Sequence, residues 1–309
     1  MSEQDDPDLD ADVIEQASRQ FSLPAIPGLP SLRGIAGTRR RWLVIIAAAG
    51  ALLVTAATLV TFRLAAGPPA GSASAGLIRE VTTVPVGKSV PGLAGLSASD
   101  SDASAYSSTL LAGGLTAVSG SPLTLSGKPE VLYVANEYCP FCTAQSWPLI
   151  IALSRFGEFS GLGTSRSPTF DKIPPIDGWT FYGSSYKSPY LAFAPVETYS
   201  NVLVNPKADP GDPTSYRRLQ RLTPAEQAVF HKFDGQGQTP FIDFGGTATA
   251  LGTDIIPATL TGLTWSQIAA DLRRPDSTAG GAILFSATVL TAELCRLTGN
   301  RPAAACSKR

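Results

Sequence analysis

The sequence is poor in the residues on which several classes of protein depend. Its 309 residues include one histidine, His231, one methionine and only 16% charged residues. A single histidine argues against a histidine-based metal centre and against a nucleophile activated by histidine. The net charge is −1 and long basic runs are absent, whereas nucleic-acid binding calls for a basic face. We therefore expect no metal, no cofactor and no nucleic-acid partner.

Cysteine is also scarce, but the four cysteines lie as two local pairs in the sequence, Cys139 with Cys142 and Cys295 with Cys306. Paired cysteines are typical of disulfides when the compartment is oxidising. The meaning of both pairs therefore depends on which side of a membrane they occupy.

An uncharged apolar run, residues 42–62, is long enough to cross a bilayer as a helix. Arg33 and Arg39 to Arg41 precede it, whereas only Arg63 follows closely, so the positive-inside rule puts the N-terminus in the cytoplasm. A cleaved signal peptide is the alternative, and residues 71–76 would then supply its cleavage site. Under either interpretation the four cysteines are exported.

The expected organisation has four parts. Residues 1–41 form a flexible cytoplasmic tail, 42–62 a single transmembrane anchor in the cell membrane, 63–80 a linker, and 81–309 an extracytoplasmic domain. Within that domain strand and helix patterns alternate, which predicts a mixed α/β fold. We expect β structure at 79–86, 129–137 and 158–222, a hairpin at 238–251, and helices at 141–156, 224–233, 264–273 and 282–297. Capping boxes at Thr223–Glu226 and Thr264–Gln267 mark two helix starts.

Cys139-Pro140-Phe141-Cys142 follows a predicted strand and opens a predicted helix. Free N–H groups and the helix dipole favour a thiolate on the first cysteine. Cys139 can then attack a substrate disulfide, and Cys142 can resolve the mixed disulfide. A structural disulfide and half of a zinc site are the alternatives for this pair.

Thr239-Pro240 stands directly before the strand of the predicted hairpin. A cis X-Pro bond is usually found in a tight turn, and here it would place Thr239 beside the cysteines as a substrate-facing element.

A strand, CPFC, a helix, Thr-Pro, a hairpin and a final helix together resemble the thioredoxin superfamily. In finer detail the segments "VLYVANEYCPFCTAQSWPLIIALSRFG", "SPYLAFAPVETYSN", "TPFIDFGG" and "LTAELCRLTGNRPAAAC" resemble thioredoxin-like membrane proteins of archaea and actinobacteria that are catalogued as a domain of unknown function. The resemblance covers most of residues 127–306. It implies a thioredoxin-like fold with a long insertion between the active-site helix and the cis-proline strand.

This sequence departs from thioredoxin near the cysteines. Tyr138 replaces the tryptophan before the first cysteine, and Tyr133 replaces the buried acid six residues before it. Glu137 is either a proton shuttle or a solvated carboxylate at the end of the strand. We expect Cys295 and Cys306 to form a structural disulfide that ties the last helix to the terminal segment, with a second redox pair as the alternative. In the chain-entropy model, closing a loop of that length stabilises the fold by roughly 3 kcal/mol.

The sequence thus predicts a membrane-anchored thiol–disulfide oxidoreductase that acts on exported cysteine-containing proteins. Its electron partner would be a quinone-linked membrane reductase or a thiol-disulfide transporter. The competing prediction is a non-catalytic binding or assembly module in which both cysteine pairs are structural.

Overall fold

The computed structural model describes residues 71–84, 115–169 and 173–306, all of which belong to the second of two units, Ala57–Arg309. The expected cytoplasmic tail and the expected anchor at 42–62 lie outside the described residues. Strands and helices are both well represented, so the mixed α/β prediction is confirmed. The strands are β1 Gly71–Ser72, β2 Leu115–Ala117, β3 Thr124–Leu125, β4 Lys128–Ala135, β5 Glu158–Ser160, β6 Gly163–Arg166, β7 Asp177–Thr180, β8 Ser185–Lys187, β9 Ala192–Glu197, β10 Tyr199–Leu203, β11 Tyr216–Arg218, β12 Phe241–Phe244 and β13 Ala248–Leu251.

The helices separate or follow these strands in chain order. They are α3 Ala75–Thr82, α5 Pro140–Leu153, α6 Pro224–Phe233, α7 Trp265–Asp271, α8 Thr278–Leu297 and α9 Ala303–Cys306, with short 3₁₀ turns η1 Pro213–Ser215 and η2 Pro257–Leu260. Both predicted capping boxes are present, because the side chains of Thr223 and Thr264 each accept the N–H three residues on and the glutamate or glutamine there reaches back.

The central sheet is built around β4. Strand β9 pairs with β4 in parallel, and β12 pairs with it in antiparallel fashion. Strand β13 continues antiparallel to β12, and β2 antiparallel to β13. The expected hairpin is therefore β12–β13, closed by Gly245 and Gly246, whose positive φ angles suit glycine.

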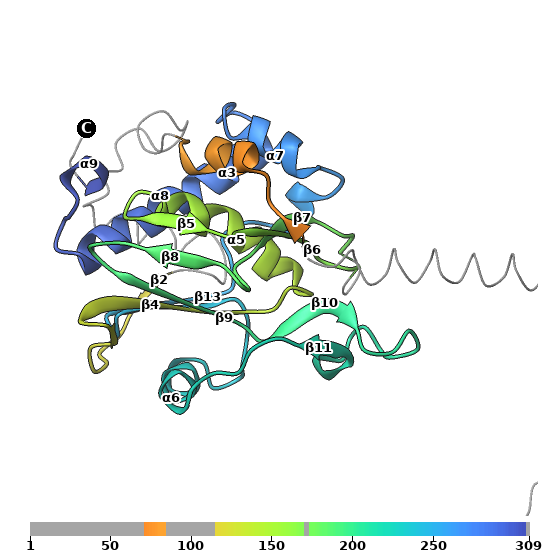
Figure 1. Ribbon diagram of the computed structural model, residues 1–309, viewed down its shortest axis with the longest axis horizontal. Coiled ribbons are helices and arrows are strands. Elements are labelled where there is room, and N and C mark those ends of the chain that lie inside the picture. Colours follow the sequence, from red (N-terminus) through yellow and green to blue (C-terminus); the bar gives the residue numbers. More distant parts are fainter. Residues whose placement is uncertain (1–70, 85–114, 170–172, 307–309) are drawn as a thin grey trace, which may run out of the picture. The chain divides into compact units, whose positions relative to one another are not determined.

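The sheet is covered on both faces (Figure 1). Alternate residues of β4 point to opposite faces, as the period of a strand requires. Val131 and Tyr133 join the larger core with α5 and α8, whereas Leu132 and Val134 join a smaller core with Phe230 of α6. Both faces of β4 are thus buried, which explains its nearly unbroken apolar sequence.

The N-terminal part of the domain differs from the prediction. Residues 79–86 were expected to be extended and 63–80 a linker, but β1 and α3 occupy 71–82. Strand β1 pairs with β6, and α3 packs against α5 and α7. Ser74 caps α3 by accepting the N–H of Leu77. This helix start was not predicted because residues 81–84 are rich in threonine and valine, which favour strands.

One helix in the described part of the chain, α8, is long and apolar enough to cross a membrane. It lies near the C-terminus rather than at the predicted position, and 78% of its apolar window is buried inside the domain. Helix α8 packs along α5, so its apolar character is accounted for by the core. It begins four residues earlier than expected, where Ser277 caps it.

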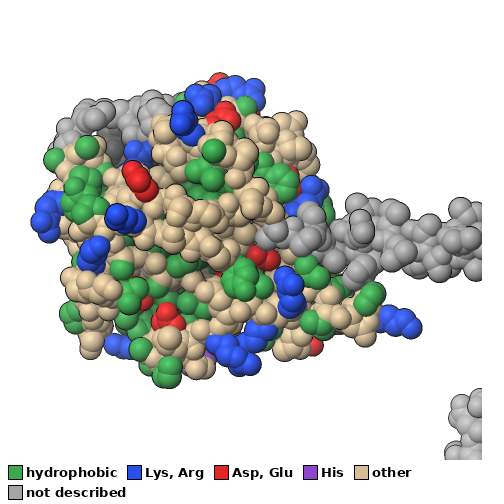
Figure 2. Space-filling model, viewed as in Figure 1, with side chains coloured by type: hydrophobic (Ala, Val, Ile, Leu, Met, Phe, Trp, Pro, Cys, Tyr) green, Lys and Arg blue, Asp and Glu red, His purple; other side chains and the backbone are tan. Residues whose placement is uncertain are grey.

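On the face shown in Figure 2, lysine and arginine side chains are scattered among polar and apolar ones rather than gathered in one basic area.

Candidate functional site

Cys139 lies at the junction between β4 and α5, as its N-cap residue. Its Sγ accepts a hydrogen bond from the backbone N–H of Cys142 at 3.2 Å. Pro140 occupies the first helical turn, where a missing N–H costs nothing. Both cysteines are free thiols and are almost fully buried. The chain thus places the first sulfur at the helix N-terminus, where a negative charge is stabilised.

The Thr239–Pro240 bond is cis and faces the cysteines. The Sγ of Cys139 lies 3.7 Å from the carbonyl oxygen of Thr239, across a separation of 100 residues in the chain. Asn136, just before the cysteines, contacts the Thr-Pro loop. Its side-chain N–H donates to the Thr239 hydroxyl at 3.1 Å, and its side-chain oxygen accepts from the hydroxyl of Thr198. These contacts hold the Thr-Pro loop against the start of α5.

The two thiols have opposite acidities. Burial acts to raise the pKa of Cys139, but hydrogen bonds from the side chain and N–H of Cys142, from Thr239 and from the Phe141 N–H outweigh it and lower the pKa. The pKa of Cys142 is raised well above its ordinary value, first by burial and then by its hydrogen bond to Cys139 and the charge there. Of the two thiols Cys139 is therefore the more acidic, and Cys142 keeps its proton to higher pH.

Tyr133 fills the space behind the cysteines. Its ring is buried, packs edge-on against Phe181 at 5.5 Å, and its hydroxyl donates to the carbonyl oxygen of Cys142 at 3.2 Å. Burial raises its pKa well above the ordinary value, so the phenol stays neutral. It can donate a hydrogen bond but cannot take up a proton as a carboxylate would.

Glu137 is buried, contrary to the expectation of a solvated carboxylate. It is 5% exposed, and one of its oxygens accepts the N–H of Asn201 at 3.2 Å. Burial raises the pKa of Glu137, with hydrogen bonds acting in the opposite direction. Strand β10 covers this side chain. No residue close to Glu137 in the sequence predicts this burial.

Glu197, at the end of β9, is a second buried acid that sequence reasoning missed. Its carboxylate accepts hydrogen bonds from the N–H groups of Phe181 and Tyr182 and from the hydroxyl of Thr180. Burial, and then the charge of Glu137, raise its pKa to about 7. A glutamate at the end of an otherwise apolar strand was the available signal. Two carboxyls that share one environment resist ionising together.

A groove of about 670 Å³ opens beside Cys139. It is lined by Tyr138 and Phe141, by Gln238 and Thr239, and by Gly252, Thr253 and Ile255 to Pro257. Tyr138 is held by a stacked contact with Tyr216, the ring centroids lying 4.5 Å apart. A ligand in this groove would lie directly against the more acidic thiol.

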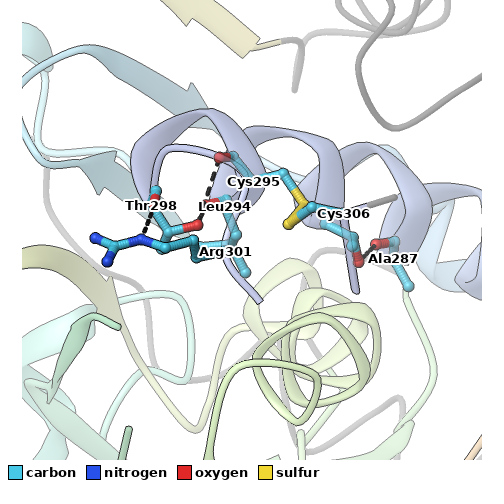
Figure 3. The surroundings of a disulfide bond; sticks show 7 residues. Ala287, Leu294, Cys295, Thr298, Arg301 and Cys306 are labelled. Carbon is cyan, nitrogen blue, oxygen red and sulfur yellow. Dashed lines mark hydrogen bonds between the residues drawn. A yellow bond between two sulfur atoms is a disulfide. The ribbon is translucent and has the colours of Figure 1, made fainter. Parts of the chain in front are cut away.

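Cys295 and Cys306 are joined by a disulfide between α8 and α9 (Figure 3). Cys295 is fully buried in the core, and Thr298 donates to the carbonyl oxygen of Leu294 beside it. The bond therefore ties the C-terminal turn to the long core helix. Within the described ranges no cluster of three potential metal-ligating side chains occurs.

Comparison with known proteins gives one match. Residues 115–206 match a family described as a domain of unknown function (DUF929), a stretch that contains both Cys139 and Cys142. No curated protein and no solved structure matches the chain. The chain is thus similar to DUF929 proteins from β2 to the loop after β10.

Proposed function

We propose that this protein is a membrane-anchored, extracytoplasmic thiol–disulfide oxidoreductase with a thioredoxin-like domain. One observation carries the proposal: the Sγ of Cys139 caps α5, accepts the Cys142 N–H at 3.2 Å and lies 3.7 Å from the Thr239 carbonyl. Hydrogen bonds such as that from the Cys142 N–H lower the pKa of Cys139, whereas the pKa of Cys142 is raised, and Cys139 lines a groove.

The order and direction of the central strands support the thioredoxin-like part of the proposal. From one side to the other they run β9, β4, β12 and β13, with β4 and β9 parallel and the other neighbours antiparallel. Helices α5 and α8 cover one face and α6 the other. This arrangement supports the proposed thioredoxin-like fold. The paired strands β5–β8 and β10–β11 lie in the insertion between α5 and the Thr-Pro loop.

The reaction needs only the two thiols. The Cys139 thiolate attacks one sulfur of a substrate disulfide, forms a mixed disulfide and expels the other sulfur as a thiolate. Cys142 then loses its proton and attacks the Sγ of Cys139, which releases the second substrate thiolate and leaves a Cys139–Cys142 disulfide. Two electrons pass from the dithiol to the substrate, and the same steps in reverse oxidise a substrate dithiol.

The proposed reaction also needs a group that accepts the proton of Cys142. Glu197 has a pKa of about 7, so at neutral pH it exists both with and without its proton. After burial, the charges of Cys142, Glu197 and Cys139 also raise the pKa of Tyr133, so these groups share one electrostatic environment. Glu137 and Glu197 are therefore the carboxyls available to exchange a proton with Cys142.

Location and partners follow from the anchor predicted at 42–62. Exported cysteine-containing proteins would be the substrates. A quinone-linked membrane reductase or a thiol-disulfide transporter would restore the redox state of the pair.

The test uses the full chain in detergent micelles. Cys139→Ser should abolish disulfide exchange with a fluorogenic peptide, whereas Cys142→Ser should accumulate a mixed disulfide that is visible by mass. A reduction potential of the pair between about −120 and −270 mV would fit an exchange catalyst. Unchanged exchange by Cys139→Ser, or a potential below about −300 mV, would favour the non-catalytic module instead.

A further inference from the structure

The groove beside Cys139 carries an inference about substrate, which rests on the function proposed above. None of the described residues that line it is charged. Its volume of about 670 Å³ falls in the range that encloses a drug-sized ligand, which suits a few residues of an extended chain better than a folded surface.

Two of the apolar side chains that line the groove remain in contact with solvent. Phe141 is 40% exposed and Ile256 is 55% exposed. Only five large apolar side chains in the described part of the chain are exposed to this degree, and two of them flank the nucleophile. Scattered apolar residues need no explanation, but a pair beside a reactive thiol indicates a surface that a ligand covers.

Ile256 is held in place by the residues around it. Ile255, next to it, is buried in the main core, and η2 packs against α5 and α8. The N–H of Gly252 donates to the carbonyl oxygen of Pro240 at 2.8 Å, which fixes the start of this segment to the Thr-Pro loop. Ile256 already lines the groove in this structure. Binding a ligand therefore costs little free energy for ordering this segment.

We propose that Phe141 and Ile256 select substrates in which an apolar side chain flanks the reactive cysteine, in an extended segment of an incompletely folded exported protein. An apolar side chain is buried between the two residues, whereas a charged one would lose its hydration without gaining a partner. Glutathione, which is small and carries charges beside its cysteine, is a poor substrate for the same reason.

The test compares three peptide disulfides that differ only beside the cysteine, where they carry leucine, glycine or glutamate. With the full chain, kcat/KM for the leucine peptide should exceed that for the glutamate peptide at least tenfold, mainly through KM. Ile256→Ser should reduce this ratio to about twofold by lowering kcat/KM for the leucine peptide. Val204→Ser is the matched control, because Val204 is 64% exposed and is not among the lining residues.

The outcomes separate the two proposals. Equal rates for all three peptides, or a preference that persists in Ile256→Ser, would refute apolar selection and leave the exchange activity standing. Failure of every peptide to react would refute both. An unchanged Tm for Ile256→Ser is expected from its exposure, and would show that an altered ratio does not arise from unfolding.

Discussion

Replacing Glu197 by glutamine should change how the stability of the protein depends on pH. The side chain is 3% exposed, and its pKa of about 7 lies above the ordinary value of 4.5 because burial, followed by the charge of Glu137, disfavours the ionised form. The folded state therefore keeps a proton that the unfolded state has lost. Stability must fall as the pH rises from about 4.5 to about 7.

The magnitude follows from those two pKa values. Between pH 5 and pH 8 this one group should lower the free energy of unfolding of the wild type by about 2 to 3 kcal/mol. Glu197→Gln cannot ionise and should lack that loss, although it weakens the hydrogen bonds from Phe181 and Tyr182 at every pH. The difference in stability between the two proteins should therefore change by that amount across the range.

The assay is urea unfolding of the full chain in detergent micelles, followed by tryptophan fluorescence at pH 5, 6, 7 and 8. Glu158→Gln is the control, since Glu158 is a glutamate of β5 that is exposed to solvent. Its stability should parallel that of the wild type. If the Glu197→Gln curve ran parallel to the wild type as well, the assignment of a raised pKa to this buried carboxyl would be wrong.

Three further outcomes are expected. Iodoacetamide should label Cys139 before Cys142 at pH 7, because only the first has a lowered pKa, and mass spectrometry of the peptide would reveal equal labelling if the asymmetry were absent. Replacing Cys295 and Cys306 together by serine should lower the free energy of unfolding, measured in urea, by roughly 3 kcal/mol. An unchanged free energy would show that the disulfide does not stabilise the fold. Gly178→Ala would place a methyl 2.4 Å from a side-chain carbon of α5, so a loss of about 1–3 kcal/mol is expected; an unchanged Tm would contradict this packing.

Much of the fold near the cysteines could be predicted because its signals are local. The capping boxes at Thr223 and Thr264 depend on residues three positions apart, and both form as predicted. The position of Cys139 at the start of α5 depends on a strand pattern followed directly by Cys-Pro. The N-terminal helix α3 was missed, since β-branched residues at its end outweighed the Ser74 cap.

Burial of the acids could not be predicted from the residues around them. Glu137 ends a strand, a position at which a carboxylate is ordinarily solvated, but the backbone of β10 covers it. Glu197 lies 60 residues further along the chain, and only the parallel pairing of β9 with β4 brings it opposite Ala135, at the end of β4. Burial and then the charge of Glu137 raise its pKa, and the N–H groups of residues 181 and 182, which no local pattern identifies, act in the opposite direction.

The sequence by itself determined the α/β class, the starts of α5, α6 and α7 and the placement of one thiol at a helix N-terminus, because these depend on hydrogen bonds within a few residues. The tertiary structure alone decided that Thr239 lies 3.7 Å from Cys139, that Ile256 faces the same groove and that Glu197 is buried with a raised pKa. These features join residues about 50 to 120 positions apart, and their energies come from packing and desolvation that exist only once the sheet has assembled.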